Sequence, residues 1–319
     1  MKTIVTGCAG FVGSTLAEAL LARGDEVLGI DCFTDYYSRE IKERNLRQLR
    51  LQKKFRIDEI NLMEVDWDEV LAGVDVVYHQ AAQAGVRSSW GKDFWMYTDW
   101  NILGTQRLLE AIRRIPEGKR PRLVYASTSS VYGERDVFPF RETDRCEPVS
   151  PYGVSKLAGE NLCLLYTHNF GLETVSLRYF TVYGPRQRPD MAFHKFIRAV
   201  FKGEPIPLFG DGEQTRDFTY VDDIVAANLA AAEHGTPGRI YNIGGGSRVT
   251  VNHTLKMLGK VMEMEVKIDR QPRQYGDMSH TAADTERART ELRWNPAVGL
   301  EEGLRAERQY VKDLMAEGL

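Results

Sequence analysis

The sequence contains little cysteine and no long apolar run. Its 319 residues include four cysteines, Cys8, Cys32, Cys146 and Cys163, which lie far apart and form no CxxC pair. The spacing gives no reason to expect a zinc site or a disulfide framework. No apolar segment approaches the roughly 20 residues that cross a bilayer, and the first residues do not resemble a signal peptide. We therefore expect no metal, no membrane association and a cytoplasmic location.

The sequence also lacks an excess of either charge. It has 42 Lys and Arg against 45 Asp and Glu, a net charge of -3. This balance gives no reason to expect a nucleic acid or an anionic membrane as a partner. The remaining composition, with 43% hydrophobic and 27% charged residues, is typical of a globular protein. The length allows one large domain or two smaller domains around a shared cleft.

Short apolar segments alternate with longer amphipathic segments through the first half. This rhythm predicts an α/β fold, a Rossmann-type doubly wound parallel sheet with helices on both faces. The strand candidates are residues 2–7, 26–31, 55–60, 74–82, 122–128 and 173–181. The helix candidates between them include residues 11–23, 93–115 and 151–170.

The second half is less regular and indicates a smaller domain. Residues 185–212 carry many Pro and Gly residues around one predicted helix, and short strands and helices mix after residue 239. We expect residues 1–184, with about 213–238, to form the dinucleotide-binding domain. Residues 185–212 and 239–319 would form a smaller mixed α/β substrate domain that covers the strand ends.

Three glycines follow the first predicted strand, in Thr-Gly-Cys-Ala-Gly-Phe-Val-Gly from residue 6. Gly7 permits a tight turn, Gly10 lets the backbone approach a pyrophosphate, and Gly13 lets the helix pack close to the strand. The amides at the helix start, around Phe11 and Val12, would face the phosphate charge. The glycine spacing is weak evidence alone, but its place between a strand and a helix predicts a dinucleotide site.

A carboxylate follows the second predicted strand at the expected distance. Asp31 lies about 20 residues after the glycines, where a carboxylate binds ribose hydroxyls. It would repel a 2′-phosphate, so NAD is favoured over NADP; the alternative is a solvent-exposed Asp at a strand end. After the third strand, either Asp58 or Glu59 could accept from the adenine amino group.

Tyr152 and Lys156 lie four residues apart in Ser-Pro-Tyr-Gly-Val-Ser-Lys. Pro151 suits a helix start, so the pair should share one helix face. A free tyrosine has a pKa near 10, and a neighbouring lysine ammonium with the positive nicotinamide ring would favour the phenolate. Tyr152 could then take a proton from a hydroxyl group as hydride leaves. The fifth strand ends near Thr128, whose hydroxyl would lie at the same sheet edge, although such residues often only cap helices.

Seven motifs together carry a resemblance to a known family. In chain order they are TGCAGFVG, HQAAQAG, STSSVYG, SPYGVSK, RYFTVYGPRQRPD, DFTYVDD and YNIGGG. Their order and spacing resemble those of the extended short-chain dehydrogenases/reductases, the NAD-dependent epimerases and dehydratases, from residue 1 to about residue 285. The resemblance implies a Rossmann fold, bound NAD and a nucleotide-sugar substrate.

The resemblance also assigns roles to residues. Thr128 matches the family's catalytic Ser/Thr, and Tyr152 and Lys156 match its base and its lysine. Asn101, in an NxxGT pattern, matches a residue that supports the site. Further residues that match the family's cofactor site are Phe11, Val12, Ile60, Ala81, Ala82, Gln83, Asn101 and Tyr179.

Two serines argue against one branch of the family. The 4,6-dehydratases carry an Asp-Glu pair directly after the catalytic threonine, and here these positions are Ser129 and Ser130. A serine hydroxyl is a poor acid or base at neutral pH, so dehydration is not expected.

Thr181 separates two kinds of epimerase. Enzymes for neutral sugars usually have Asn at this position, and this sequence looks like the UDP-glucuronate 4-epimerases instead. In them the sugar carboxylate is held by hydroxyls that match Thr128, Ser129, Ser130 and Thr181. The implied reaction interconverts UDP-glucuronate and UDP-galacturonate through a 4-keto intermediate. That ketone lies β to the carboxylate, and the hydroxyls would hold the carboxylate in an orientation that resists loss of CO2.

The resemblance extends to the nucleotide end of the substrate. Arg188 and Arg216 match arginines near the UDP diphosphate, and Asp277 matches an acid that binds the uridine ribose. Arg216 could instead form a structural ion pair with Asp217. Two residues depart from the family pattern, Gln80 for a usual leucine and Tyr275 for a usual proline. Relatives often dimerise through helices that match residues 93–115 and 151–170, so a homodimer is expected.

Three alternatives remain open at this point. A UDP-glucuronate decarboxylase or a UDP-glucose 4-epimerase would use the same first step. A non-catalytic NAD-binding regulator of the same fold would need only the glycine loop and Asp31, so retention of Thr128, Tyr152 and Lys156 favours an enzyme.

Overall fold

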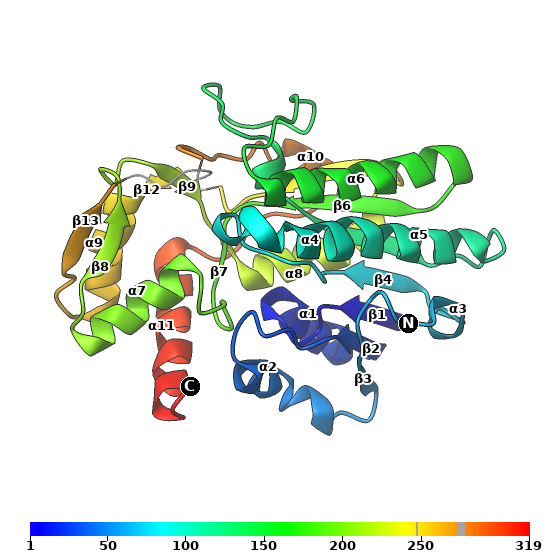
Figure 1. Ribbon diagram of the computed structural model, residues 1–319, viewed down its shortest axis with the longest axis horizontal. Helices are drawn as coiled ribbons and strands as arrows, with labels where there is room; N and C mark the ends of the chain where they lie inside the picture. The colour runs from blue at the N-terminus through cyan, green and yellow to red at the C-terminus, as the bar shows by residue number, and fades with distance from the viewer. Residues whose placement is uncertain (247, 273–277) are drawn as a thin grey trace.

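A seven-stranded parallel sheet forms the centre of the computed structural model, which describes residues 1–246, 248–272 and 278–319 (Figure 1). The strand order is β11-β6-β5-β4-β1-β2-β3, and each neighbouring pair is parallel. The strands are β1 Lys2–Thr6, β2 Glu26–Asp31, β3 Phe55–Glu59, β4 Val76–His79, β5 Arg122–Thr128, β6 Thr174–Tyr179 and β11 Arg239–Ile243. The predicted Rossmann-type doubly wound fold is therefore confirmed.

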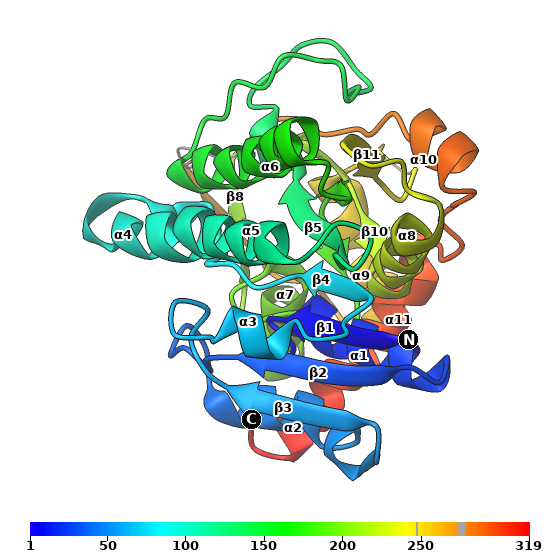
Figure 2. The same ribbon diagram turned by 90° about the vertical axis from the view of Figure 1, so that its right-hand side faces the viewer.

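Helices cover both faces of this sheet (Figure 2). On one face the core contains α1 Phe11–Ala22, α8 Val221–His234 and the end of α10 Glu286–Glu291. On the other face it contains α3 Trp67–Val70, α5 Gly104–Arg114 and α6 Pro151–Phe170. Strand residues alternate between the two faces, because Ile4 packs against the second set and Val5 against the first. Burial on both faces explains why a central strand such as β4, Val-Val-Tyr-His, is mainly apolar, whereas the edge strand β3 includes Arg56 and Asp58.

The remaining elements of this region connect the sheet to its helices. They are α2 Arg39–Leu46, the short helices η1 Leu49–Leu51, η2 Arg87–Ser89 and η3 Gly91–Asp93, α4 Phe94–Met96, the π-helix η4 Tyr97–Leu103 and the 3-10 helix η5 Ser129–Val131. The described residues contain no helix that is both long and apolar enough to cross a bilayer.

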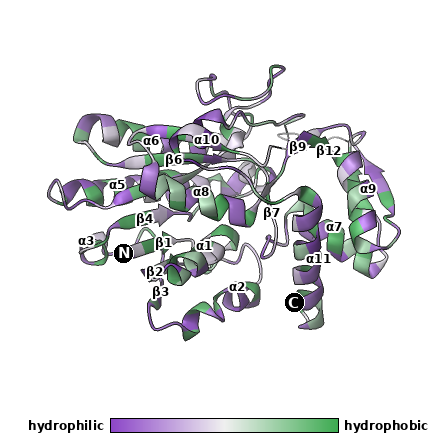
Figure 3. Cartoon of the chain, turned by 180° about the vertical axis from the view of Figure 1, so that it is seen from behind, coloured by the Kyte–Doolittle hydropathy of each residue, from purple (hydrophilic) through white to green (hydrophobic). Residues whose placement is uncertain are grey.

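A second apolar core lies beside the carboxyl ends of the strands. It is built on α7 Ala192–Lys202, α9 Val251–Met262 and α11 Leu300–Ala316, with β8 Ile206–Phe209. Three two-stranded pairs complete this part, with β7 Val182–Tyr183 on β10 Thr219–Tyr220, β9 Thr215–Asp217 on β12 Arg248–Thr250, and β8 on β13 Ile268–Gln271. In Figure 3 these three helices stand apart from the large sheet, and each mixes purple and green residues, as amphipathic helices do.

One predicted domain boundary is wrong. Residues 239–243 were expected in the smaller domain, but they form β11, the edge strand that pairs with β6. Ala288 and Trp294 likewise pack into the core of the large sheet. A five-residue strand looks the same in sequence whichever sheet it joins, so only the pairing with β6 reveals its place. The rest of the division into two domains stays a prediction.

Candidate active site

A cavity of about 840 Å³ opens at the carboxyl ends of the central strands. Its walls come from the glycine turn after β1, the ends of β2, β4, β5 and β6, the first turns of α6, and residues around α7 and β8. The cavity therefore lies between the two cores, at the edge where parallel α/β sheets bind ligands.

The turn after β1 is shaped for a pyrophosphate. Gly7 has φ +68°, and a Cβ at this position would lie 2.8 Å from the backbone of Ala81. A Cβ on Gly13 would lie 2.1 Å from the Gly7 carbonyl oxygen, so only glycine lets α1 approach the turn this closely. No side chain caps the start of α1 at Gly10. Its first amides are therefore free to bind an anion in the cavity, so the turn fits the phosphates of NAD.

Asp31 lines the same cavity at the end of β2. One carboxylate oxygen accepts from the Ala9 amide at 3.0 Å and the other from the Phe33 amide at 2.8 Å. Burial raises the pKa of Asp31, while these backbone bonds oppose the shift. Each oxygen keeps a further lone pair, so the carboxylate can also accept from two ribose hydroxyls. The residues present fit NAD.

Most of the other predicted cofactor residues also line the cavity: Phe11, Val12, Ile60, Ala81, Ala82, Gln83 and Tyr179. Asp58 and Glu59 are not among the described residues that line it. Asp58 lies 3.2 Å from Arg56, and the exposed Glu59 pairs with Arg39 at 2.5 Å. The structure therefore brings neither carboxylate to the cavity wall.

Asn101 stands behind the wall and does not line it. It is buried on η4, accepts from the Gln83 amide at 2.7 Å and donates to the Gln83 carbonyl at 3.0 Å. It also donates to Ser155 Oγ at 2.9 Å. Asn101 thus ties the loop after β4 to α6, which is a supporting position rather than a cofactor contact.

The three predicted catalytic residues meet in the cavity. Ser150 caps α6 by accepting from the Gly153 amide, so Tyr152 and Lys156 lie one helical turn apart. Thr128 ends β5, and its Oγ1 lies 3.3 Å from Ser130 Oγ. Thr128, Tyr152 and Lys156 all line the wall.

Burial shifts the pKa values of Lys156 and Tyr152 in the protein without NAD. Lys156 is 2% exposed, its Nζ lies 4.2 Å from the centre of the Tyr125 ring, and burial lowers its pKa to about 7. Burial raises the pKa of Tyr152, while Arg188 and Thr128 oppose the shift. The protein groups alone therefore hold Tyr152 as the phenol, because desolvation outweighs the neighbouring positive charge.

The predicted substrate residues divide into three groups. Ser129, Ser130, Thr181 and Arg188 line the cavity together with Thr128. Arg216 is outside the described wall, and its Nη1 donates to the carbonyls of Thr215 and Ser279. Asp277, like Tyr275, lies outside the described residues.

Gln80, one of the two departures from the family pattern, takes part in a partly buried ring of hydrogen bonds. Tyr179 donates to Gln80 at 3.0 Å, Gln80 donates to Asn228 at 2.9 Å, and Asn228 donates back to Tyr179 at 2.7 Å. The ring links β4, β6 and α8 beside the glycine turn. The leucine that is usual at position 80 cannot make these bonds. Asn228, which no motif identified, provides the hydrogen-bond partner that Gln80 needs.

The comparisons agree with this geometry. Residues 3–244 match the NAD dependent epimerase/dehydratase family. This match spans most of the sequence, and the chain belongs to that family.

Individual relatives narrow the comparison. A crystal structure of UDP-glucuronic acid 4-epimerase from Bacillus cereus, in complex with UDP-glucuronic acid and NAD, superimposes with a TM-score of 0.94 at 44% identity, covering 98% of this chain and 100% of that one. UDP-glucuronate 4-epimerase of Thermodesulfobacterium geofontis is 36% identical over 97% of this chain and 96% of its own. An uncharacterized UDP-glucose epimerase of Bacillus subtilis, YtcB, is 43% identical over 98% of this chain and 99% of its own.

Proposed function

We propose that this protein is a UDP-glucuronate 4-epimerase, an isomerase that interconverts UDP-glucuronate and UDP-galacturonate with bound NAD. One observation supports the substrate assignment: Thr128, Ser129, Ser130 and Thr181, which each carry a hydroxyl group, line the same cavity as the glycine turn and Asp31. Hydroxyl donors can satisfy a carboxylate without a buried cation beside it. The similarity to two UDP-glucuronate 4-epimerases supports the same assignment.

The glycine turn and Asp31 would hold the cofactor by its pyrophosphate and ribose. When bound, NAD accepts a hydride from C4 of the sugar, returns it to the opposite face, and adds a positive charge near Tyr152. Tyr152 takes the proton of the C4 hydroxyl and later returns it. Thr128 holds the C4 oxygen, and Lys156 favours the ionised state of the tyrosine when its own amine is charged.

The four side-chain hydroxyls around the sugar carboxylate would decide whether the reaction ends in epimerisation or in decarboxylation. A ketone at C4 lies β to that carboxylate. Such acids lose CO2 when the carboxylate is out of the plane of the ketone, because the breaking C–C bond then overlaps the π system of the carbonyl. Thr181, on the turn between β6 and β7, faces the same cavity as Ser129 and Ser130. Fixed hydroxyl donors on several sides hold the carboxylate in one orientation, which favours epimerisation over decarboxylation.

A UDP-glucose 4-epimerase is the second candidate, because the Bacillus subtilis relative carries that name. A neutral hexose has a hydroxymethyl group where glucuronate has its carboxylate, and it needs fewer hydrogen-bond donors there. The hydroxyls of Ser129, Ser130 and Thr181 therefore favour UDP-glucuronate over UDP-glucose as the substrate.

Proton NMR of purified protein mixed with UDP-glucuronate, without added NAD, tests the proposal. We expect UDP-galacturonate to accumulate without UDP-xylose. No NAD needs to be added, because the cofactor stays bound. Formation of UDP-xylose would assign a decarboxylase. No reaction even with added NAD, together with turnover of UDP-glucose, would assign the neutral-sugar enzyme.

Several further expectations belong to this proposal. Arg188 and Arg216 would bind the UDP diphosphate, and the protein would function in the cytoplasm. A homodimer through α5 and α6 would cover apolar side chains that the single chain exposes, Val154 at 47% and Leu165 at 52%. Size-exclusion chromatography with light scattering tests the dimer, and a monomer would contradict it.

A further inference from the structure

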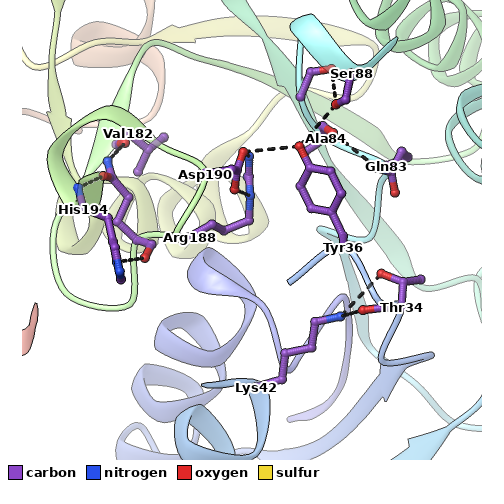
Figure 4. A network of polar contacts seen from close by, with 12 residues as sticks. Thr34, Tyr36, Lys42, Gln83, Ala84, Ser88, Val182, Arg188, Asp190 and His194 are labelled. Carbon is purple, nitrogen blue, oxygen red and sulfur yellow. Dashed lines mark hydrogen bonds and ion pairs between the residues drawn. The ribbon is translucent and has the colours of Figure 1, made fainter. Parts of the chain in front are cut away.

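Four polar side chains from segments far apart in the sequence meet in the wall of the cavity (Figure 4). We call Tyr36, Ser88, Arg188 and Asp190 the cleft latch. Tyr36 follows β2 and donates to Asp190 at 3.2 Å across 154 residues of sequence. Its hydroxyl also lies 3.3 Å from Oγ of Ser88, on the short helix η2 that follows β4. The latch therefore connects the two cofactor-side loops to the segment before α7.

The backbone around the latch is shaped to receive the Tyr36 hydroxyl. Gly85 has φ +106°, and a Cβ there would lie 2.3 Å from Tyr36 Oη and 2.4 Å from Ser88 Oγ. Tyr97 holds this loop in place, because its hydroxyl lies 2.9 Å from both Ser88 Oγ and the Gly85 carbonyl. Any other residue at position 85 would be strained and would displace the phenol.

Asp190 holds the guanidinium of Arg188 by two parallel hydrogen bonds. Arg188 Nε and Nη2 each lie 2.9 Å from a different oxygen of the carboxylate. Burial works against the charge of Arg188, but Asp190 outweighs it and raises the pKa of the arginine; in turn, Arg188 lowers the pKa of Asp190 against the effect of burial. The third nitrogen, Nη1, makes no hydrogen bond to any described residue, and Arg188 lines the cavity.

We propose that Asp190 and Tyr36 are positioning residues for the substrate diphosphate. They hold the Arg188 guanidinium in one orientation, so that its remaining N–H groups face the phosphate oxygens. A fixed guanidinium loses little side-chain entropy on binding, whereas a free arginine must be ordered by the ligand itself. This inference rests on the proposed function, because it requires a nucleoside diphosphate in the cavity.

Asp190 carries the same sign of charge as the diphosphate, which allows its positioning effect to be distinguished from its electrostatic effect. A carboxylate in the wall of a site for a multiply charged anion weakens binding through repulsion. Asp190 therefore helps only if the geometry it imposes on Arg188 outweighs its own charge. This opposition makes the two effects separable by experiment.

The test is calorimetric titration of UDP into NAD-loaded protein, with wild type, Asp190→Asn, Tyr36→Phe and the double variant. We expect Asp190→Asn to raise the Kd for UDP about tenfold and Tyr36→Phe about threefold. The double variant should bind UDP no more than twofold more weakly than Asp190→Asn, because Tyr36 acts through Asp190. In turnover of UDP-glucuronate, KM should rise in parallel while kcat stays within threefold.

Two matched controls identify a nonspecific effect. Asp25→Asn breaks another Arg–Asp pair two residues apart, with Arg23, at the opposite end of β2 from the cavity. Tyr310→Phe removes a phenol bond to Asn45 outside the cavity wall. Both controls should bind UDP as wild type does.

The outcomes separate this proposal from the proposed function. Unchanged or tighter UDP binding by Asp190→Asn, or independent effects of the two substitutions, would overturn the positioning role. UDP lacks the sugar, so the binding result stands even if UDP-glucuronate is not the substrate. A wild type that binds no UDP overturns the latch proposal outright. If Asp190→Asn does not fold, unchanged UDP affinity in Tyr36→Phe refutes the role equally.

Discussion

Replacing Lys156 by methionine should stabilise the cofactor-free protein while removing its activity. Lys156 is 2% exposed, and burial lowers the pKa of its amine from 10.5 to about 7. Each pKa unit corresponds to about 1.4 kcal/mol, so folding costs about 5 kcal/mol where the amine is charged in both states. Methionine has a similar length and carries no charge, so Lys156→Met removes this cost.

The sign of the pH dependence follows from the direction of the shift. The pKa of Lys156 is lower in the folded protein than in the unfolded chain, so between pH 7 and 10.5 the folded state binds fewer protons. The stability of the wild type therefore rises with pH across this window, and the full cost of burial is present below pH 7. Lys156→Met should be more stable than wild type by about 4 kcal/mol at pH 7 and about 1.5 kcal/mol at pH 9.5.

Urea unfolding of cofactor-free protein at both pH values measures this difference. Lys202→Met, which changes an exposed lysine on α7, is the control and should unfold as wild type does. Turnover of NAD-loaded Lys156→Met should fall at least roughly a hundredfold. Equal stability of Lys156→Met and wild type at both pH values would show that the amine is not desolvated and would refute the reasoning.

Three further substitutions test the site. Tyr152→Phe should lower turnover at least roughly a hundredfold yet retain NAD in the purified protein; near-normal turnover would remove Tyr152 from the chemistry. Gly13→Ala places a Cβ 2.1 Å from the Gly7 carbonyl oxygen and should weaken NAD binding at least roughly tenfold by titration of stripped protein. Gly299→Ala, with no atom within 4 Å of its Cβ, is the matched control and should bind NAD normally. Thr181→Val removes one hydroxyl at nearly constant shape, and proton NMR should detect more UDP-xylose; an unchanged product ratio would contradict the role of the hydroxyl.

The central sheet could be predicted closely from the sequence. The strands expected at 26–31 and 122–128 have the same bounds in the structure, as β2 and β5, because buried parallel strands are mainly apolar segments that alternate with helices. The strand expected at 74–82 is shorter, and β4 covers Val76–His79. Residues 80–82, Gln-Ala-Ala, were included in the expected strand but leave the sheet after His79 and line the cavity, which composition cannot reveal.

Local spacing predicted the parts of the site that depend on neighbouring residues. The glycine turn occupies one strand-turn-helix unit, and Tyr152 and Lys156 occupy one turn of α6. The charge state was less predictable, because the pKa of Lys156 depends on burial by β5 and the packed helices around it. The positions of Asp58 and Glu59 were also undecided by sequence, since each pairs with an arginine outside the cavity.

The sequence by itself determined the glycine turn, the pairing of Tyr152 with Lys156 on one helix and the alternating order of the central elements. These features depend on contacts within about one helical turn or one strand, so their residue types and spacing are sufficient to specify them. Only the tertiary structure decided that β11 joins the large sheet, that Gln80 closes a ring with Asn228, and that Tyr36 meets Asp190. Those contacts join segments up to 154 residues apart, and their partners are set by how the helices pack on the sheet, not by any local pattern.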